Sequence, residues 1–213
     1  MQLDFEKTKK LFERYKLPLA RSILIKKPEQ LIKLTKKIGF PLVLKISSVD
    51  IIHKSDINGV KIGIENKEEL IKAYNEIINN MKKRRVKIEG VLMQKMEEGK
   101  EIIIGVKRDI QFGPVLLFGL GGVFVEALRD ISIRIAPVDK KEALNMIKEI
   151  KGYKILEGIR GEKAVNIDAL ASIITKISNM VLKNKKIIEL DLNPIIVNDK
   201  KATIVDARII VES

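Results

Sequence analysis

Apolar residues recur at helical spacing in several stretches of the chain. Near the N-terminus, Phe5, Leu11 and Phe12 fall on one side of a helical projection, which predicts an amphipathic helix over residues 4–16 that stops before Pro18. Pro28 begins a second stretch of this kind, capping patterns introduce two more at Asn66 and Asp139, and an apolar stripe predicts a last one after Asp168. These later helices are expected at residues 28–38, 66–84, 139–152 and 168–183.

Shorter runs with alternating or continuous apolar residues predict strands between these helices. We expect strands at residues 42–47, 60–64, 90–96, 101–107, 114–118 and 131–135, and two more within residues 187–211. The acidic, glycine-containing connector at residues 97–100 is the best place to divide the chain. We therefore predict one domain over residues 1–213, with a first lobe over 1–95 that includes the N-terminal helix and a second lobe over 96–213.

The last two strands predict a pair of facing oxygen ligands. If the turn at residues 198–201 is symmetric, Asn193 lies directly across from Asp206, and Asp191 lies across from Arg208. Directly opposed side chains stand ~5 Å apart at their β-carbons. Amide and carboxylate oxygens are ligands that magnesium accepts at ~2.0–2.1 Å. A solvent-exposed hairpin whose polar face meets only water is the alternative.

Charge and composition limit the classes of function. The chain has 213 residues, 46% of them hydrophobic, no cysteine and a formal net charge of +13. No apolar run approaches a membrane span and the N-terminus does not resemble a signal peptide, so we expect a cytoplasmic protein. The basic residues are spread through amphipathic segments with acids nearby, and there is no tryptophan, so solvated helix faces are favoured over a nucleic-acid surface. A phosphorylated substrate or an acidic protein partner would suit the same charge.

Three further features could carry phosphate chemistry. Lys45 lies in the strand at residues 42–47, where it could neutralise a phosphate or simply occupy a sheet edge. Gly121 and Gly122 could bring backbone amides close to a phosphate, although a tight turn needs glycine as well, and the pattern is neither Walker A nor the Rossmann fingerprint. His53, the sole histidine, could be a metal ligand, an acid or base, a phosphate-accepting nucleophile, or an ordinary loop residue.

Five motifs, in this order, resemble those of a known family. They are IGFPLVLKI, HKSDINGV, FGPVLLFGLGGVFVE, IKGYKILEGIRG and ELDLNPIIV with IVDARI. They resemble the beta subunit of ADP-forming acetate–CoA ligase, also called ADP-forming acetyl-CoA synthetase. That family belongs to the ATP-grasp superfamily and is related to the beta subunit of succinyl-CoA synthetase.

The resemblance implies an α+β protein with the ATP-grasp fold, in which the nucleotide lies between two α/β lobes. It also implies a ligase that converts acyl-CoA, ADP and phosphate into acid, ATP and CoA, with Mg²⁺ and ATP or ADP bound. A CoA-binding alpha subunit is the implied partner, commonly in a heterotetramer of two alpha and two beta subunits. In this family the alpha subunit carries the phosphate on its own histidine and largely chooses the acid.

The resemblance also assigns roles to single residues. Lys45 resembles the phosphate-binding lysine, Asn193 and Asp206 resemble the magnesium pair, and His53 resembles a second phosphate-carrying histidine. The implied connector whose backbone reads adenine comprises Gln94, Lys95 and Met96, and the implied ribose contact is Glu101. The implied phosphate-side loop contains Gly121, Gly122 and Glu126. The resemblance also implies that Arg134 and Arg160 face the transferred phosphate or, for Arg160, the alpha subunit.

Two residues depart from the family pattern. Asn58 stands where a second glycine is usual, and asparagine tolerates the positive φ of such a turn. Lys95 replaces a more usual acid, so the family pattern does not assign a role to its side chain. A ligase of the same fold for another acid, such as succinate, and a non-catalytic cationic binding module are the alternative functions. Stabilisation by Mg²⁺–ADP would separate the enzyme from the binding module.

Overall fold

The computed structural model describes residues 1–48, 51, 54, 57–85, 88–122 and 130–212. The chain forms two compact units, one of Met1–Leu19 with Glu97–Ser213 and the other of Ala20–Met96. Each unit has its own sheet and its own cluster of buried apolar side chains. Both units combine helices with antiparallel sheets, so the predicted α+β class is confirmed.

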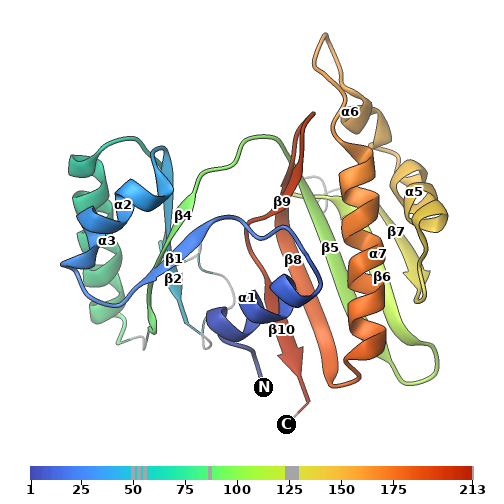
Figure 1. The fold of residues 1–213 in the computed structure, drawn as a ribbon, viewed down its shortest axis with the longest axis horizontal. Coiled ribbons are helices and arrows are strands. Elements are labelled where there is room, and N and C mark those ends of the chain that lie inside the picture. Colours follow the sequence, from blue (N-terminus) through green and yellow to red (C-terminus); the bar gives the residue numbers. More distant parts are fainter. Residues whose placement is uncertain (49–50, 52–53, 55–56, 86–87, 123–129, 213) are drawn as a thin grey trace. The chain divides into compact units, whose positions relative to one another are not determined.

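The unit of Ala20–Met96 is a sheet covered by two helices. Its strands have the order β1-β4-β2-β3, and α2 and α3 lie on one side of them (Figure 1). The elements are β1 (Ser22–Ile25), α2 (Gln30–Ile38), β2 (Leu42–Ser47), β3 (Val60–Ile64), α3 (Lys67–Lys83) and β4 (Gly90–Lys95). Strand β2 is paired with β4 on one side and with β3 on the other, so it lies inside the sheet.

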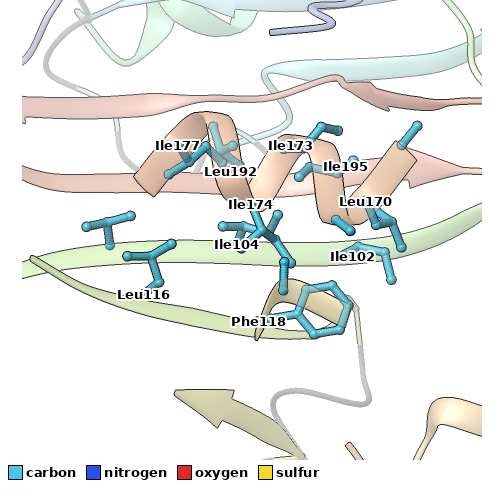
Figure 2. Close-up of a cluster of buried hydrophobic side chains, with 14 of the residues drawn as sticks. Ile102, Ile104, Leu116, Phe118, Leu170, Ile173, Ile174, Ile177, Leu192 and Ile195 are labelled. Atoms are coloured by element: carbon cyan, nitrogen blue, oxygen red, sulfur yellow. The ribbon is translucent and has the colours of Figure 1, made fainter. Parts of the chain in front are cut away.

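The larger unit is built on a sheet of order β10-β8-β5-β6-β7, with β9 paired to β8. Its strands are β5 (Lys100–Asp109), β6 (Gly113–Leu120), β7 (Ile131–Ile135), β8 (Ile187–Val197), β9 (Ala202–Ile204) and β10 (Arg208–Val211). Its helices are α1 (Phe5–Arg14), α5 (Lys140–Glu149), α6 (Tyr153–Glu157) and α7 (Ile167–Lys183). Helix α7 packs on one face of this sheet (Figure 1), and its apolar stripe contacts the inward-facing residues of the strands. Figure 2 shows this contact between Leu170, Ile173, Ile174 and Ile177 and the strand residues Ile102, Ile104, Leu116, Phe118, Leu192 and Ile195.

Side-chain caps mark the start of several helices. The side chains of Asp4, Asn66 and Asp139 each accept a hydrogen bond from a backbone N–H three residues later, at 2.7–2.9 Å. Such caps satisfy N–H groups that the first helical turn leaves without an intrahelical partner. The strands predicted at residues 60–64 and 131–135 coincide with β3 and β7, so these predictions are confirmed.

The N-terminal helix differs from its predicted place. The sequence predicts it in a first lobe over residues 1–95, whereas residues 1–19 form one compact unit with residues 97–213. Phe12 is fully buried in the same cluster as Leu190 and Ile204, and the backbone N–H of Leu3 donates to Ile209 O at 2.9 Å. The helix packs where its apolar face can be covered, and that place is distant in sequence.

No helix among the described residues is long and apolar enough to cross a membrane.

Candidate functional site

The C-terminal strands and the segment between them contain the two predicted oxygen ligands, Asn193 and Asp206. Asp191 pairs with Arg208 across β8 and β10, as predicted, and Ile195 pairs with Ile204 in the same register. Asn193 and Asp206 lie between these two paired stretches. The predicted single return strand is interrupted at residues 205–207, where Val205 N and Asp206 N both donate to the carbonyl of Pro194, at 3.2 and 3.4 Å.

A bulge in β8 lies at Asn193 and Pro194. Ile102 pairs with Ile195 and Ile104 with Leu192, so Asn193 and Pro194 together oppose the single residue Ile103. Leu192 and Ile195 are both fully buried, so two residues instead of one separate these inward side chains, and Asn193, the first of the two, is exposed. A bulge redirects side chains in this way while the strands on either side stay paired.

The donors at this bulge fit a magnesium ion that also binds phosphate. Asp206 is half-buried, and its Oδ1 accepts a hydrogen bond from Ala207 N at 3.0 Å, which orients the carboxylate. In the described part of the chain no group of three or more histidine, cysteine or acidic side chains could cage a metal. Magnesium commonly takes only one or two protein oxygens and fills its other positions with water and phosphate oxygens. Asn193 and Asp206 match that ligand set.

The predicted glycine turn and the predicted ribose contact meet at the end of β6. Gly121 N donates to Glu101 O at 2.7 Å, and a β-carbon at Gly121 would lie 2.9 Å from that of Glu101. Gly122 has a φ of +65°, and a β-carbon there would lie 3.1 Å from Oε2 of Glu101. The close approach and the left-handed backbone both require glycine. The Glu101 carboxylate therefore lies against the turn.

Lys45 is buried in the middle of a sheet. It lies in β2 with only 7% of its surface exposed, between Val60 on β3 and Leu92 on β4. The alternative of a lysine at a sheet edge is therefore wrong. Burying an ammonium group is costly unless an anion or other acceptor compensates it.

The predicted adenine-reading segment is held firmly by its own sheet. Gln94 is 2% exposed and donates from Nε2 to the hydroxyl of Ser22 at 2.9 Å. The backbone N–H groups of Lys95 and Met96 donate to the carbonyls of Arg21 and Pro41, at 3.0 and 3.2 Å, so they serve strand pairing. No sequence signal pointed to Ser22, because its pairing with Gln94 depends on the register of β1 and β4.

The structure gives the Lys95 side chain a local role. Its Nζ donates to the carbonyls of Phe40 at 2.5 Å and Gly39 at 3.5 Å, directly after the last residue of α2. A cation near a helix C-terminus donates hydrogen bonds to the unpaired carbonyls and interacts favourably with the negative end of the helix dipole. Lysine at this position thus stabilises the end of α2.

The two predicted arginines lie in different surroundings. Arg134 on β7 forms ion pairs with Glu142 and, at 2.5 Å, with Glu149, so its guanidinium ties β7 to α5. The hydrogen bond to Glu149, followed by the one to Glu142, raises the pKa of Arg134. Arg160 is exposed in the turn after α6, with a φ of +54°. His53 and Glu126 lie outside the described residues.

Comparison with known proteins gives one consistent family. A family model described as an ATP-grasp domain matches residues 1–211. The chain is 46% identical to the Acetate–CoA ligase [ADP-forming] I subunit beta of Pyrococcus furiosus, over 95% of this chain and 88% of that protein. It is 43% identical to Acetate–CoA ligase [ADP-forming] I of Archaeoglobus fulgidus, over 94% of this chain, but it spans only 30% of that longer relative.

Solved structures agree with this assignment. The acetyl-coenzyme A synthetase 1 of Ca. Korarchaeum cryptofilum, in complex with coenzyme A and Ca-AMPCP, matches with a TM-score of 0.94 and 44% identity over 99% of this chain and 93% of that one. A second structure of that enzyme contains coenzyme A and Mg-AMPPCP, with its phosphohistidine segment pointing towards the nucleotide-binding site. It matches with a TM-score of 0.85 and 41% identity, over 99% of this chain and 92% of that one.

Proposed function

Because the chain belongs to the ATP-grasp family and, within it, to the beta subunits of ADP-forming acetate–CoA ligases, we propose that it is the nucleotide-binding part of an ADP-forming acid–CoA ligase. The reaction is acyl-CoA, ADP and phosphate giving acid, ATP and CoA. The observation that carries the proposal is the hydrogen bond from Asp206 N to Pro194 O, 3.4 Å long, which brings the Asp206 backbone to the β8 bulge that contains Asn193. An amide oxygen and a carboxylate oxygen at one place suit a magnesium ion shared with nucleotide phosphates.

The proposed chemical step moves a phosphoryl group between histidine and nucleotide. The P–N bond of a phosphohistidine breaks, and a new P–O bond forms to the terminal phosphate oxygen of ADP. Catalysis of such a transfer consists mainly of positioning and of stabilising charge on the phosphoryl oxygens. Magnesium held by Asn193 and Asp206 would supply part of that positive charge, and Lys45 would supply more from within β2.

The other residues take binding roles in this proposal. Gly121 and Gly122 keep the turn free of side chains so that it can lie close to the nucleotide phosphates, and Glu101, whose carboxylate lies against that turn and whose carbonyl accepts from Gly121 N, contacts the ribose. Residues 94–96 contact the adenine. Arg160 contacts the transferred phosphate or the partner subunit. We assign Arg134 to holding α5, because two glutamates already engage its guanidinium.

We further propose a CoA-binding alpha subunit as partner, in a complex of two alpha and two beta chains. The length of the Archaeoglobus fulgidus relative supports it, since this chain matches only 30% of that protein. His53 is proposed as the residue that accepts the phosphate from the partner's phosphohistidine. The acid depends on the partner, and the cytoplasmic location stays a prediction.

The nucleotide part of the proposal can be tested on this chain alone. Mg²⁺–ADP at about 100 times its Kd should stabilise the wild type by about 2.7 kcal/mol in thermal unfolding. Asp206→Ala should lose most of this stabilisation, whereas Asp199→Ala, which removes an acid from the turn of the same hairpin, should keep it. Equal stabilisation of all three proteins would contradict the hairpin site. A cationic binding module would show no stabilisation even in the wild type.

The same variants test His53 once the chain is reconstituted with its co-purified partner. Incubation with labelled ATP and magnesium should place an acid-labile phosphate on His53 in the wild type and in Asp199→Ala, but not in Asp206→Ala. Label found only on the partner would show that His53 does not carry phosphate.

A further inference from the structure

A buried carboxylate joins two segments of the larger unit beside the glycine turn. Asp130, directly before β7, is 8% exposed. Its Oδ1 accepts a hydrogen bond from Lys151 N at 2.7 Å, and its Oδ2 accepts one from Gly152 N at 2.6 Å. Bonds from backbone N–H groups to an ionised carboxylate are among the stronger hydrogen bonds in proteins. One side chain thus holds two consecutive amides of a segment more than twenty residues away.

The amides held by Asp130 lie against the last residue of β6. A β-carbon at Gly152 would overlap Cδ1 of Leu120 and would lie 3.2 Å from Oδ2 of Asp130. Leu120 is 3% exposed, so it has little room to move away. Glycine at position 152 therefore allows the backbone to pack directly on Leu120. Gly121 and Gly122 follow Leu120 without an intervening residue.

The backbone of β6 also contacts Asp130 itself. A β-carbon at Gly119 would lie 2.9 Å from Asp130 O, and Gly119 pairs with Ile131 across β6 and β7. The end of β6 is therefore enclosed on one side by Asp130 and on another by Gly152, and Gly121 N is bonded to Glu101 O. These contacts fix the point from which the glycine turn leaves the sheet.

We propose that Asp130 is a positioning residue for nucleotide binding. By holding Lys151 and Gly152 against Leu120, its carboxylate fixes the backbone direction of the glycine turn. This inference rests on the proposed function, in which that turn faces the nucleotide phosphates. An asparagine would keep the shape of the side chain but not the role, because its amide group would oppose a backbone N–H with another donor.

The test compares two substitutions that each remove a buried bond to a backbone amide. Asp130→Asn breaks the clamp, while Ser178→Ala removes the bond from Val138 N to the buried Ser178 hydroxyl, 2.8 Å long, in the same core. Both should lower the thermal midpoint. At a temperature where both are folded, Asp130→Asn should raise the Kd for Mg²⁺–ADP about tenfold, equivalent to the loss of one hydrogen bond to a charged group. Ser178→Ala should stay within about twofold of the wild type, because removing a neutral hydrogen bond away from the site costs stability alone.

A Kd for Asp130→Asn no different from that of Ser178→Ala would overturn the positioning role and leave the proposed function intact. If the wild type itself does not bind Mg²⁺–ADP, both are wrong. Gly152→Ala provides a second route if Asp130→Asn does not fold. It keeps the carboxylate but pushes on Leu120, so it should also raise the Kd, and an unchanged Kd in that variant would overturn the inference.

Discussion

The N-terminal helix offers a direct test of how the chain divides into units. Phe12 is fully buried, and it shares a cluster of apolar side chains with residues of β8 and β9. Replacing it with alanine removes the ring and leaves a cavity in the larger unit. If residues 1–19 belong to that unit, as the structure has it, the damage should be confined there.

The size of the effect follows from the burial of the ring. An aromatic ring that buries about 150 Å² at about 25 cal/mol per Å² contributes about 4 kcal/mol. This value agrees with the loss of stability on Phe→Ala substitution in protein cores, which is about 3–5 kcal/mol. For a chain of this length, a loss of about 4 kcal/mol of unfolding free energy lowers the thermal unfolding midpoint by about 8–16 °C.

Hydrogen exchange measured peptide by peptide locates the loss of stability. In Phe12→Ala, peptides from β5 and β8 should exchange faster, while peptides from β2 and β4 should keep their wild-type rates. Leu31→Ala is the reciprocal variant, because Leu31 is 5% exposed in the core of the other unit. It should accelerate exchange in β2 and β4 instead. Faster exchange in β2 and β4 on changing Phe12 would refute the assignment of the helix.

Two other features give measurable predictions. Arg108 donates from Nε to Ile187 O at 2.9 Å and from Nη2 to Val181 O at 2.7 Å, so Arg108→Met should cost about 1–3 kcal/mol of unfolding free energy in urea titrations. Arg108→Lys should recover only part of this, and full recovery would show that charge alone matters. The pKa of Glu142 is lowered below 4.5, chiefly by its hydrogen bond from Arg134. The resulting stabilisation should be present above pH 4.5 and disappear as the pH falls through the lowered value, and Glu142→Gln should flatten that slope.

Much of the local structure could be predicted because it depends on neighbouring residues. The caps at Asp4, Asn66 and Asp139 involve contacts only three residues apart, so the sequence contains all the information they need. The pairing of Asp191 with Arg208 followed from a short turn for the same reason. The motifs shared with ADP-forming acetate–CoA ligases identified the family, and the comparisons confirmed it.

The faces of the C-terminal strands could not be predicted as well. Strict alternation along β8 would bury Ile196 together with Leu190 and Leu192, yet Ile196 is only half-buried, and Ile195 and Val197 are fully buried. The bulge at Asn193 adds one residue to β8 and exchanges the two faces beyond it. A bulge is visible only when the partner strand is known.

By itself, the sequence determined most of the helices and strands, the caps at Asn66 and Asp139, the family and the residue types available for binding phosphate and magnesium, because these depend on local spacing and on motifs. It did not predict β1 or α6. Only the tertiary structure decided that Lys45 is buried inside a sheet, that the first helix packs with the C-terminal strands, and that Asp130 holds the segment beside the glycine turn. Each of these depends on contacts between residues far apart in the chain. Such contacts are selected by which apolar faces and unpaired backbone groups can be satisfied together, and no short stretch of sequence contains that information.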